Sequence, residues 1–269
     1  MNGPKHQPLT PNPYQPMPGH YAKKQLLSPS KLIAWSHSRR FATGLSLARR
    51  FAGQRVVDYG CGDGTFLELL LRGPGAPRAA VGVEITDELV RDCTTRLGHV
   101  AGLSFARVEE LGRAEHAAAY DGVVCMEVLE HVVDVEEVLD RLVRLLAPGG
   151  TLIVSVPVET GLALPVKQTA RRIAGWRGIG DCPGTTPYTL QELAAGVFAG
   201  GRQHISRPVH LSPDGTRFHD HKGFNWRALR QRLRRRLRVE RTLASPLAWL
   251  PPGLASQVWL LARRAERDA

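Results

Sequence analysis

A regular alternation of short apolar strands and amphipathic helices over residues 54–157 constrains the fold of this chain more than any other feature. Five strands are predicted by the segments RVVDYG, AAVGVEI, LSFARV, DGVVCM and TLIVSVP, and helical patterns or turns separate them. Strands that alternate with helices form right-handed crossovers and therefore a parallel sheet. Ligands bind at the carboxyl ends of such strands, so the residues that follow each strand are the first candidates for a functional site.

The rest of the 269-residue chain is arranged around this predicted core. Residues 1–20 contain six prolines and predict a disordered tail. Residues 21–53 predict a helical segment, in which Ser28 is the N-cap and Pro29 the first helical residue. Residues 158–220 are rich in Gly, Pro and Arg and predict an inserted cap over the substrate region. Residues 221–269 predict a further helix and the last two strands of the core, RVERTLA and SQVWLLARR.

The net charge of +11 and the pI near 10.1 suggest nucleic acid, an anionic membrane surface or an acidic substrate as a partner. Eight arginines fall within residues 227–241, where Leu229, Leu233 and Leu237 form one apolar stripe. This pattern predicts an amphipathic helix docked on the sheet, with solvated arginines on its other faces. An acidic or phosphorylated acceptor and RNA backbone are the alternatives, and RNA ranks lower because no RNA-binding module accompanies the arginines.

The cysteines and the apolar runs bear on the compartment. The four cysteines match no zinc pattern and are expected to be reduced thiols. No apolar run has the length of a transmembrane span, and residues 1–30 lack the apolar region of a signal peptide. We therefore expect a cytoplasmic protein. No sequence feature indicates an oligomeric state.

The segment VVDYGCGDGTF places Asp58, Gly60, Gly62 and Gly64 at the turn between the first strand and a helix. Glycines let the backbone approach a ligand closely, and the amide groups of the helix N-terminus point at that ligand. The third glycine comes one position earlier than in the dinucleotide fingerprint, which favours a ligand with a positive amine and no pyrophosphate. Glu84 ends the second strand, where a carboxylate can accept both hydroxyls of a ribose. An ordinary glycine-rich turn without a cofactor is the alternative.

These segments, together with YDGVVCMEVLEHV and LAPGGTLIVSVP, resemble the class I S-adenosylmethionine-dependent methyltransferases over residues 54–157. The resemblance implies an α/β, Rossmann-like, doubly wound sheet of seven strands, mostly parallel with an antiparallel last strand. It also implies S-adenosylmethionine as the cofactor. The cofactor-binding residues that it implies are Asp58, Gly60, Cys61, Gly62, Gly64, Glu84, Ile85, Glu109 and Met126.

The resemblance assigns a part of the cofactor to several of these positions. Asp58 and the glycine turn would hold the methionine part, and Glu84 the ribose. Ile85 would pack on the adenine, and Met126 would line the floor of the site. Glu109 would lie near the adenine amine, although the segment ARVEEL leaves open whether Glu109 or Glu110 takes that place.

The segment MEVLEHV, residues 126–132, follows the fourth strand and carries Glu127, Glu130 and His131 within one helical turn. At i, i+3 and i+4 these side chains share one face, at the edge of the sheet where the ligand would bind. Two carboxylates and an imidazole can bind a divalent ion such as Mg²⁺ or Mn²⁺. The alternative is a turn that seats the cofactor and caps the next helix without a metal.

A second segment, RFHDHKGFNW at residues 217–226, resembles a D-H-K-F-x-W segment of the small-RNA 3′-terminal 2′-O-methyltransferases. In that family an E-x-x-E-H turn and a later histidine bind a divalent metal. A similar H-D-x-x-K-F segment occurs in ubiquinone-pathway O-methyltransferases. This resemblance implies His221 as a metal ligand beside Glu127, Glu130 and His131, with His219 as a substitute ligand or base. His131, His219 and His221 are therefore the candidate catalytic residues.

Taken together, the motifs predict a methyltransferase that uses S-adenosylmethionine to methylate an oxygen of a small-molecule acceptor. The natural-product, quinone and polysaccharide pathways are the expected settings. An RNA ribose 2′-O-methyltransferase is the alternative among enzymes, and a non-catalytic S-adenosylmethionine-binding partner protein is the alternative from another class. His37, in the first predicted helix, is expected at the surface, and a position in the site is the alternative.

Overall fold

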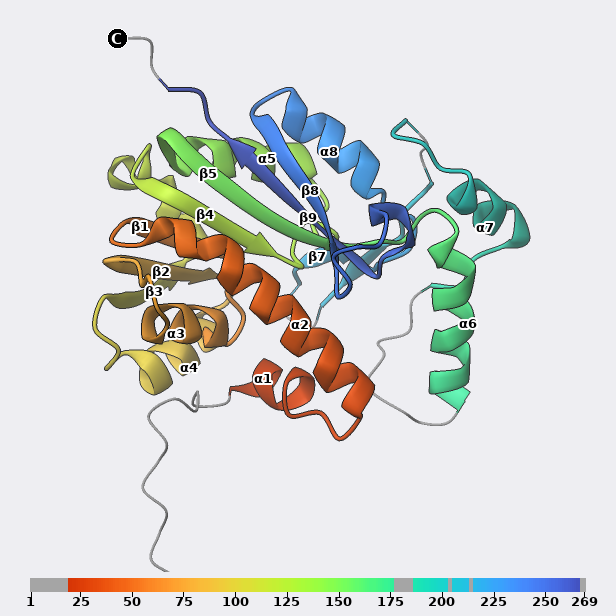
Figure 1. The fold of residues 1–269 in the computed structure, drawn as a ribbon, viewed down its shortest axis with the longest axis horizontal. Helices are drawn as coiled ribbons and strands as arrows, with labels where there is room; N and C mark the ends of the chain where they lie inside the picture. The colour runs from red at the N-terminus through yellow and green to blue at the C-terminus, as the bar shows by residue number, and fades with distance from the viewer. Residues whose placement is uncertain (1–18, 177–185, 203–204, 213–214, 267–269) are drawn as a thin grey trace, which may run out of the picture.

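The computed structural model describes residues 19–176, 186–202, 205–212 and 215–266 (Figure 1). Most of the tail predicted for residues 1–20 therefore lies outside the described residues. Two helices precede the sheet, α1 (His20–Gln25) and α2 (Lys31–Ala48), and the 3-10 turn η1 (Arg49–Phe51) follows them. The predicted cap residue was wrong: Ser30, and not Ser28, is the N-cap of α2. The Ser28 hydroxyl instead accepts the backbone N–H of Ser30 at 3.3 Å, in a turn that ends before the helix.

The core is one seven-stranded sheet in the order β3-β2-β1-β4-β5-β9-β8. Strands β1 to β5 pair in parallel, and β9 runs antiparallel to both of its neighbours. This arrangement confirms the predicted mostly parallel sheet with an antiparallel last strand. The bounds are β1 (Arg55–Tyr59), β2 (Ala79–Glu84), β3 (Leu103–Arg107), β4 (Tyr120–Met126), β5 (Leu146–Pro157), β8 (Arg238–Ser245) and β9 (Gln257–Arg263).

Helices cover both faces of the sheet, so alternate residues of the central strands are buried on opposite sides (Figure 1). Val57 of β1 packs with the helices α5 and α8, whereas its neighbour Val56 packs with α2, α3 and α4. Both faces of a parallel sheet must be buried, which is why its strands are almost continuously apolar. The remaining bounds are α3 (Thr65–Arg72), α4 (Asp87–Leu97), η2 (Val108–Gly112), η3 (Ala114–His116), α5 (Val135–Leu145), α8 (Trp226–Arg234) and η4 (Pro252–Leu254).

Between β5 and α8 the chain forms α6 (Ala163–Trp176), α7 (Leu190–Val197) and a hairpin of β6 (Val209–Leu211) and β7 (Arg217–His219). A buried ion-pair cluster fixes α6 to the end of β5. The Glu159 carboxylate is fully buried and accepts Lys167 Nζ at 2.7 Å and both terminal nitrogens of Arg171 at 2.8 and 2.9 Å. Charged, bidentate hydrogen bonds of this kind are strong and directional, so the segment is held at the carboxyl edge of the sheet.

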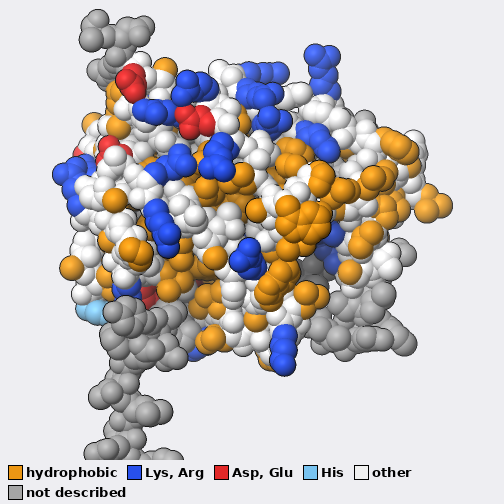
Figure 2. Space-filling model, viewed as in Figure 1, with side chains coloured by type: hydrophobic (Ala, Val, Ile, Leu, Met, Phe, Trp, Pro, Cys, Tyr) orange, Lys and Arg blue, Asp and Glu red, His pale blue; other side chains and the backbone are white. Residues whose placement is uncertain are grey.

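Hydrophobic side chains gather on the side of the molecule where Figure 1 places α6 and α7, as Figure 2 shows. Large exposed side chains there include Leu162, Val166, Leu190 and Phe198. This segment therefore leaves apolar surface beside the carboxyl edge of the sheet. None of the described helices combines the length and the apolar character that crossing a membrane would require.

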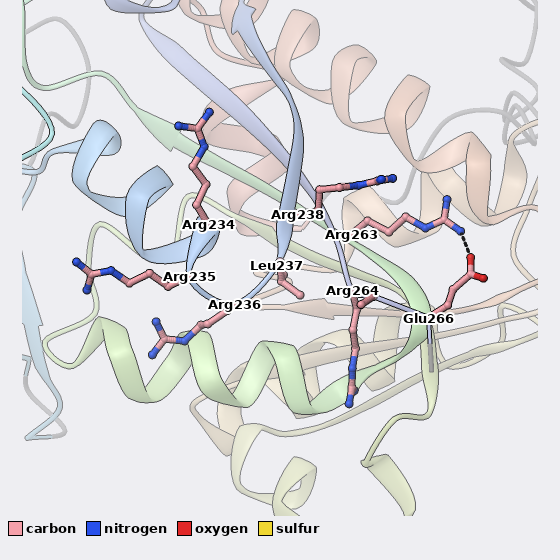
Figure 3. A pocket seen from close by; sticks show the side chains of 9 residues that line it. Arg234, Arg235, Arg236, Leu237, Arg238, Arg263, Arg264 and Glu266 are labelled. Atoms are coloured by element: carbon pink, nitrogen blue, oxygen red, sulfur yellow. Dashed lines mark hydrogen bonds and ion pairs between the residues drawn. The ribbon is translucent and has the colours of Figure 1, made fainter. Parts of the chain in front are cut away.

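The arginine-rich helix α8 docks through Leu229 and Leu233, and Leu237, three residues after the end of the helix, is buried as well. Arginines at the end of α8 and at the end of β9 surround a surface hollow of about 540 Å³ (Figure 3). The end of β9 pairs with Thr151 of β5, which in turn pairs with Gly122 near the start of β4. The hollow therefore lies at the amino edge of the parallel strands, opposite the edge where ligands are expected.

Candidate active site

A cavity of about 550 Å³ opens at the carboxyl ends of β1, β2 and β4, where the sequence predicts the site. Its volume is typical of cavities that hold small molecules and cofactors. Ten of the predicted site residues line it: Gly60, Cys61, Gly62, Glu84, Ile85, Met126, Glu127, Glu130, His131 and His221. The glycine turn, the end of β2 and the segment after β4 thus face one another across one space.

The glycine turn forms one wall of this cavity. Gly60 and Gly62 have φ angles of 77° and 59°, the left-handed region that glycine adopts without strain. A Cβ atom on Gly60 would lie 2.4 Å from Val128 Cγ2, so a larger residue has no room there. The Glu84 carboxylate accepts the N–H of Gly62 at 2.6 Å and that of Ile85 at 3.1 Å. These bonds hold a buried carboxylate at the end of β2, beside an Ile85 side chain that is 47% exposed.

Asp58 lies behind the same turn and does not line the cavity. Its side chain is fully buried, and neither carboxylate oxygen accepts a hydrogen bond from a described residue. Burial, followed by the nearby charge of Glu84, raises the pKa of Asp58 to about 8. A buried acid without partners at a ligand site indicates a position whose ionised form is stabilised by the ligand.

Gly64 and Glu109 lie outside the cavity. A Cβ on Gly64 would meet Leu97 Cδ1 at 2.8 Å, so the absence of a side chain lets α3 pack against the end of α4. The Glu109 carboxylate is mostly exposed and pairs with Arg107 at 3.0 Å. The chain turns into η2 at this point, and Glu110 accepts the N–H of Arg107 at 2.9 Å. Neither carboxylate therefore reaches the place predicted for the adenine amine, and Val108 lines the cavity instead.

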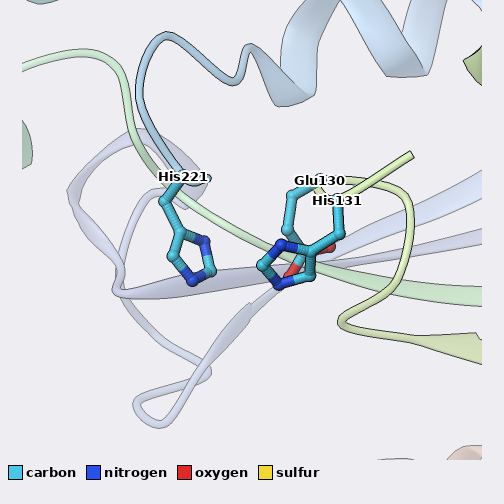
Figure 4. A group of neighbouring side chains, drawn as sticks. All are labelled: Glu130, His131 and His221. Carbon is cyan, nitrogen blue, oxygen red and sulfur yellow. The ribbon is translucent and has the colours of Figure 1, made fainter. Parts of the chain in front are cut away.

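Glu130, His131 and His221, which line the same cavity, form one group (Figure 4). One ligand atom from each lies within 4.8 Å of the others. Glu130 is fully buried, and neither of its oxygens accepts a hydrogen bond from a described residue. His131 Nδ1 lies 2.9 Å from the carbonyl oxygen of His219, and His131 Nε2 lies 4.0 Å from Glu130 Oε1. The carbonyl contact fixes the ring and leaves Nε2 directed toward the group.

Electrostatics in this group follow from burial. Burial first, and then the charge of Glu127, raises the pKa of Glu130 well above its usual value. Burial and the neighbouring His131 lower the pKa of His221 to about 4. The group thus disfavours both an isolated negative charge on Glu130 and a positive charge on His221. A bound cation would stabilise the negative charge on Glu130, and the neutral imidazole of His221 could bind it.

Two members of the predicted catalytic and metal sets lie outside this group. Glu127 lines the cavity, but its Oε1 accepts Gln257 Nε2 at 2.6 Å and Ser155 Oγ at 3.1 Å. His219 is buried away from the cavity, and its Nδ1 lies 2.7 Å from the carbonyl oxygen of Pro208. The structure therefore brings together three of the four predicted ligands, and His219 contacts the group only through its backbone.

Residues of the two N-terminal helices also line the cavity, and sequence reasoning missed most of them. His37, Arg40 and Phe41 come from α2, and Tyr21 and Gln25 from α1. The expectation of a surface position for His37 was wrong, because its ring is largely buried in the cavity wall. Burial, with the charge of Arg40, lowers its pKa to about 4. The spacing i, i+3, i+4 of the three α2 residues was the available signal, since it places them on one helix face.

Comparison with known proteins identifies the family. The family model described as "Methyltransferase domain" matches residues 34–196, more than half of the chain. The chain belongs to this methyltransferase family. The match begins within α2 and ends within α7, so it includes every element that lines the cavity except α1 and the segment of His221.

Relatives of this methyltransferase include ubiquinone biosynthesis O-methyltransferases. That of Psychrobacter arcticus is 36% identical over 177 residues, which cover 62% of this chain and 66% of that protein. That of Xylella fastidiosa is 39% identical over 109 residues, or 39% of this chain and 42% of that protein. The matches thus span less than two thirds of the length of these relatives.

Solved structures share the fold. A protein from Pyrococcus horikoshii has a TM-score of 0.58 at 14% identity and covers 91% of this chain and 96% of its own. An N-methyltransferase from Bradyrhizobium japonicum, solved with S-adenosyl-L-homocysteine, has a TM-score of 0.52 at 16% identity. It covers 86% of this chain and 88% of its own. These likenesses agree with the Rossmann-like sheet described above.

Proposed function

We propose that this methyltransferase binds S-adenosylmethionine in the cavity and transfers its methyl group to an oxygen of a small-molecule acceptor. One observation carries the proposal: the glycine turn with Glu84 and the group of Glu130, His131 and His221 line the same cavity of about 550 Å³. A cofactor wall and a wall of acid–base groups thus share one space, as methyl transfer requires.

The residues present fit the cofactor. Gly60 and Gly62 have positive φ angles, so the glycine turn can present backbone groups to a ligand, and Val128 packs where a Cβ on Gly60 would stand. Glu84 offers a fixed carboxylate for the ribose hydroxyls, and the exposed Ile85 offers an apolar surface for the adenine ring. Asp58 would ionise next to the positive charges of the cofactor, which explains a buried acid without partners. When bound, S-adenosylmethionine supplies an electrophilic methyl group.

The opposite wall would prepare the acceptor. An alcohol is a poor nucleophile at neutral pH, so it needs a base or a cation near its oxygen. His131, with Nδ1 held by a carbonyl, presents Nε2 as a proton acceptor. Met126 and Phe41 add apolar lining to the same cavity. Alignment of the acceptor oxygen with the methyl group would supply most of the remaining rate enhancement.

We further propose that Glu130, His131 and His221 hold a divalent metal, with Mn²⁺ favoured over Mg²⁺. The unpartnered buried oxygens of Glu130 and the close approach of two imidazoles fit a cation. Imidazole suits transition metals, whereas Mg²⁺ prefers oxygen ligands and keeps its water. When bound, a divalent ion lowers the pKa of a hydroxyl and orients its oxygen.

The acceptor class follows from the relatives and from the position of the charges. The relatives described above are named ubiquinone biosynthesis O-methyltransferases. Their names favour a small hydroxylated molecule as the acceptor. The arginines that line the surface hollow, Arg234 at the end of α8 and its neighbours, lie at the other edge of the sheet and give no support to an acidic or phosphorylated acceptor. A cytoplasmic location belongs to the same proposal, since the described cysteines are free thiols.

A labelled-methyl transfer screen tests the proposal. The chain would be incubated with methyl-labelled S-adenosylmethionine and panels of catechols, other small alcohols and RNA, with Mn²⁺, with Mg²⁺ or with EDTA. We expect label on a small hydroxylated acceptor and loss of transfer in EDTA. Methyl transfer to RNA ribose alone would refute a small-molecule acceptor and identify the protein as an RNA methyltransferase. Cofactor binding without transfer to any acceptor would favour a non-catalytic partner protein. Methyl transfer that persists in EDTA would refute the proposed metal.

A further inference from the structure

The arginine surface is defined here by the residues that line the second hollow, of about 540 Å³ (Figure 3). Eight arginines and one glutamate fall within residues 227–241, a balance of +7 beside the +11 of the whole chain, and four of these arginines line the hollow. Six arginines line the hollow: Arg234, Arg235, Arg236, Arg238, Arg263 and Arg264. They come from the end of α8, the start of β8 and the end of β9.

This surface is separate from the methyl-transfer cavity. Gln257, the first residue of β9, bonds Glu127 in the cavity wall, whereas Arg263 is the last residue of the same strand. Six strand residues at about 3.4 Å each separate the two ends by roughly 20 Å. A ligand on the arginine surface would therefore not place a reacting atom in the cavity.

Two of the arginines lie directly opposite each other on neighbouring strands of the sheet. Arg238 of β8 is the register partner of Arg263 of β9. Like charges directly opposite on neighbouring strands destabilise a sheet. Each is offset by one local acid, Glu240 at 2.9 Å from Arg238 and Glu266 at 2.9 Å from Arg263. These exposed pairs contribute little net stability, so the strand pair retains charge at a cost to the fold.

Helix α8 also places two arginines close to each other. Arg230 and Arg234 are spaced i, i+4 on α8, where like charges are destabilising. Burial, and then the charge of Arg234, lowers the pKa of Arg230. Arg236 of the same surface pairs with Asp140 at 2.6 Å and with Glu136 at 2.8 Å, but no described carboxylate pairs with Arg234 or Arg235. Positive charge is therefore concentrated here without full compensation, which is the condition for attracting an anion.

The directions of the side chains indicate an extended anion. In Figure 3 the guanidinium groups of Arg234, Arg235 and Arg236 fan apart from the end of α8, and those of Arg238 and Arg263 point to the other side of the hollow. A compact phosphate would need groups that converge. Groups that spread over a surface match phosphates repeated along a polymer, and the guanidinium fork fits phosphate oxygens.

We propose that the arginine surface binds the phosphate backbone of double-stranded nucleic acid without reading its sequence. This binding goes beyond the proposed methyl transfer and does not depend on it. Nucleic-acid interfaces are polar and strongly positive. Protein interfaces have an apolar core, and membrane surfaces take inserted apolar groups, but the lining residues of the hollow include no exposed large hydrophobic residue. No aromatic ring lines it either, so base stacking on a single strand has no platform.

Fluorescence anisotropy with a labelled duplex of about two helical turns tests this proposal. The full chain would be titrated between about 50 and 200 mM salt, because neutralised phosphates release counterions. Contact with about four phosphates predicts a slope of log affinity against log salt near −3.6. The double variant Arg234→Gln/Arg235→Gln removes two contacts and is expected to reduce the slope by about 1.8. The matched control Arg91→Gln/Arg113→Gln removes the same charge from exposed residues outside this surface and is expected to keep the slope.

Competitors separate this partner from others that carry negative charge. Tripolyphosphate and vesicles containing phosphatidylglycerol are expected to compete only at much higher phosphate concentration than unlabelled duplex. Absence of duplex binding at low salt would overturn the proposal, and so would equal losses in the variant and its control. Preferential binding of the vesicles, of tripolyphosphate or of single strands would also overturn it. Methyl transfer, measured on the same variants, is expected to be unchanged and reports separately on the cavity.

Discussion

Gln257 Nε2 donates a hydrogen bond of 2.6 Å to Glu127 Oε1, which joins the start of β9 to the end of β4. Ser155 of β5 donates to the same oxygen at 3.1 Å. Three strands thus hold one carboxylate at the cavity wall. This bond decides which acids of the segment MEVLEHV are available to a cation: Glu127 is occupied, whereas the Glu130 oxygens accept no hydrogen bond from a described residue.

The first prediction concerns the metal group. Glu130→Gln and His221→Ala are each expected to weaken Mn²⁺ binding by about 100-fold or more, since loss of groups that merely orient ligands costs about 10- to 100-fold. Glu127→Gln is the matched control because its amide oxygen can still accept from Gln257, and we expect a change below about tenfold. Titration calorimetry with Mn²⁺ measures these affinities. Equal losses in Glu127→Gln and Glu130→Gln would show that Glu127 is a ligand.

The second prediction concerns Glu84 and the cofactor. Hydrogen bonds to a charged group contribute about 1.5–3 kcal/mol each, so Glu84→Ala is expected to weaken S-adenosylmethionine binding by about 10- to 100-fold. Glu84→Gln, which keeps an acceptor for the N–H of Gly62, should lose less. Glu88→Ala, at an exposed position at the start of α4, is the control and should leave the affinity unchanged. Unaltered affinity in Glu84→Ala would refute the cofactor assignment.

The third prediction follows from the pKa of about 8 at Asp58. The unfolded chain releases this proton near pH 4, whereas the folded protein without ligand keeps it up to about pH 8. The contribution of Asp58 to the free energy of unfolding therefore falls as the pH rises through this window. Asp58→Asn removes this component, so its stability relative to the parent should increase from about pH 5 to pH 8 in chemical denaturation. A difference in the free energy of unfolding that stays constant from about pH 5 to pH 8 would contradict the raised pKa of Asp58.

The same acid predicts the pH dependence of binding. A positively charged ligand favours the ionised form of Asp58. As the pH rises toward 8, the Kd for S-adenosylmethionine should therefore fall, by up to about tenfold for each pH unit. Calorimetry in buffers of different ionisation enthalpy would show proton release on binding. Asp58→Asn should bind more weakly and release no proton from this group. Proton release that persists in Asp58→Asn would assign it to another residue.

The fourth prediction concerns the helix that borders the glycine turn. The Asp63 carboxylate accepts the N–H of Ala22 in α1 at 2.7 Å and the N–H of Thr65 in α3 at 3.2 Å. Asp63→Ala should increase hydrogen exchange of the α1 amides by about tenfold or more and raise the off-rate of S-adenosyl-L-homocysteine. Asp92→Asn serves as the control, since Asp92 pairs with Arg96 at 2.8 Å and bonds no described residue of α1. Unchanged exchange in α1 would show that packing alone holds the helix.

Much of the fold was predictable because it depends on local patterns. The alternation over residues 54–157 predicted the parallel strands, and the strand ends identified Gly60, Gly62, Glu84 and Glu130 as neighbours of one edge. Period-2 and period-3.6 hydrophobic patterns specify elements, and the handedness of crossovers then limits the topology. For the same reason the leucine stripe of α8 predicted its docked face.

The direction of individual side chains was less predictable. Glu109 was expected near the adenine amine, but the 3-10 turn η2 leaves it at the surface beside Arg107. His37 was expected at the surface, but the path of α2 across the sheet places it in the cavity wall. Each outcome depends on how an element packs against others, and a local pattern does not contain that information.

The sequence by itself determined the sheet, the glycine turn and the set of acids and histidines at its carboxyl edge, because short-range spacing decides which residues follow a strand. The tertiary structure decided which of them share a site. Gln257, 130 residues away, occupies Glu127, and the loop that ends in His221 meets the turn of Glu130 and His131. It also placed Arg234 and its neighbours, at the end of α8, at the opposite edge, beside the last residues of β9, which runs antiparallel and ends away from the cavity.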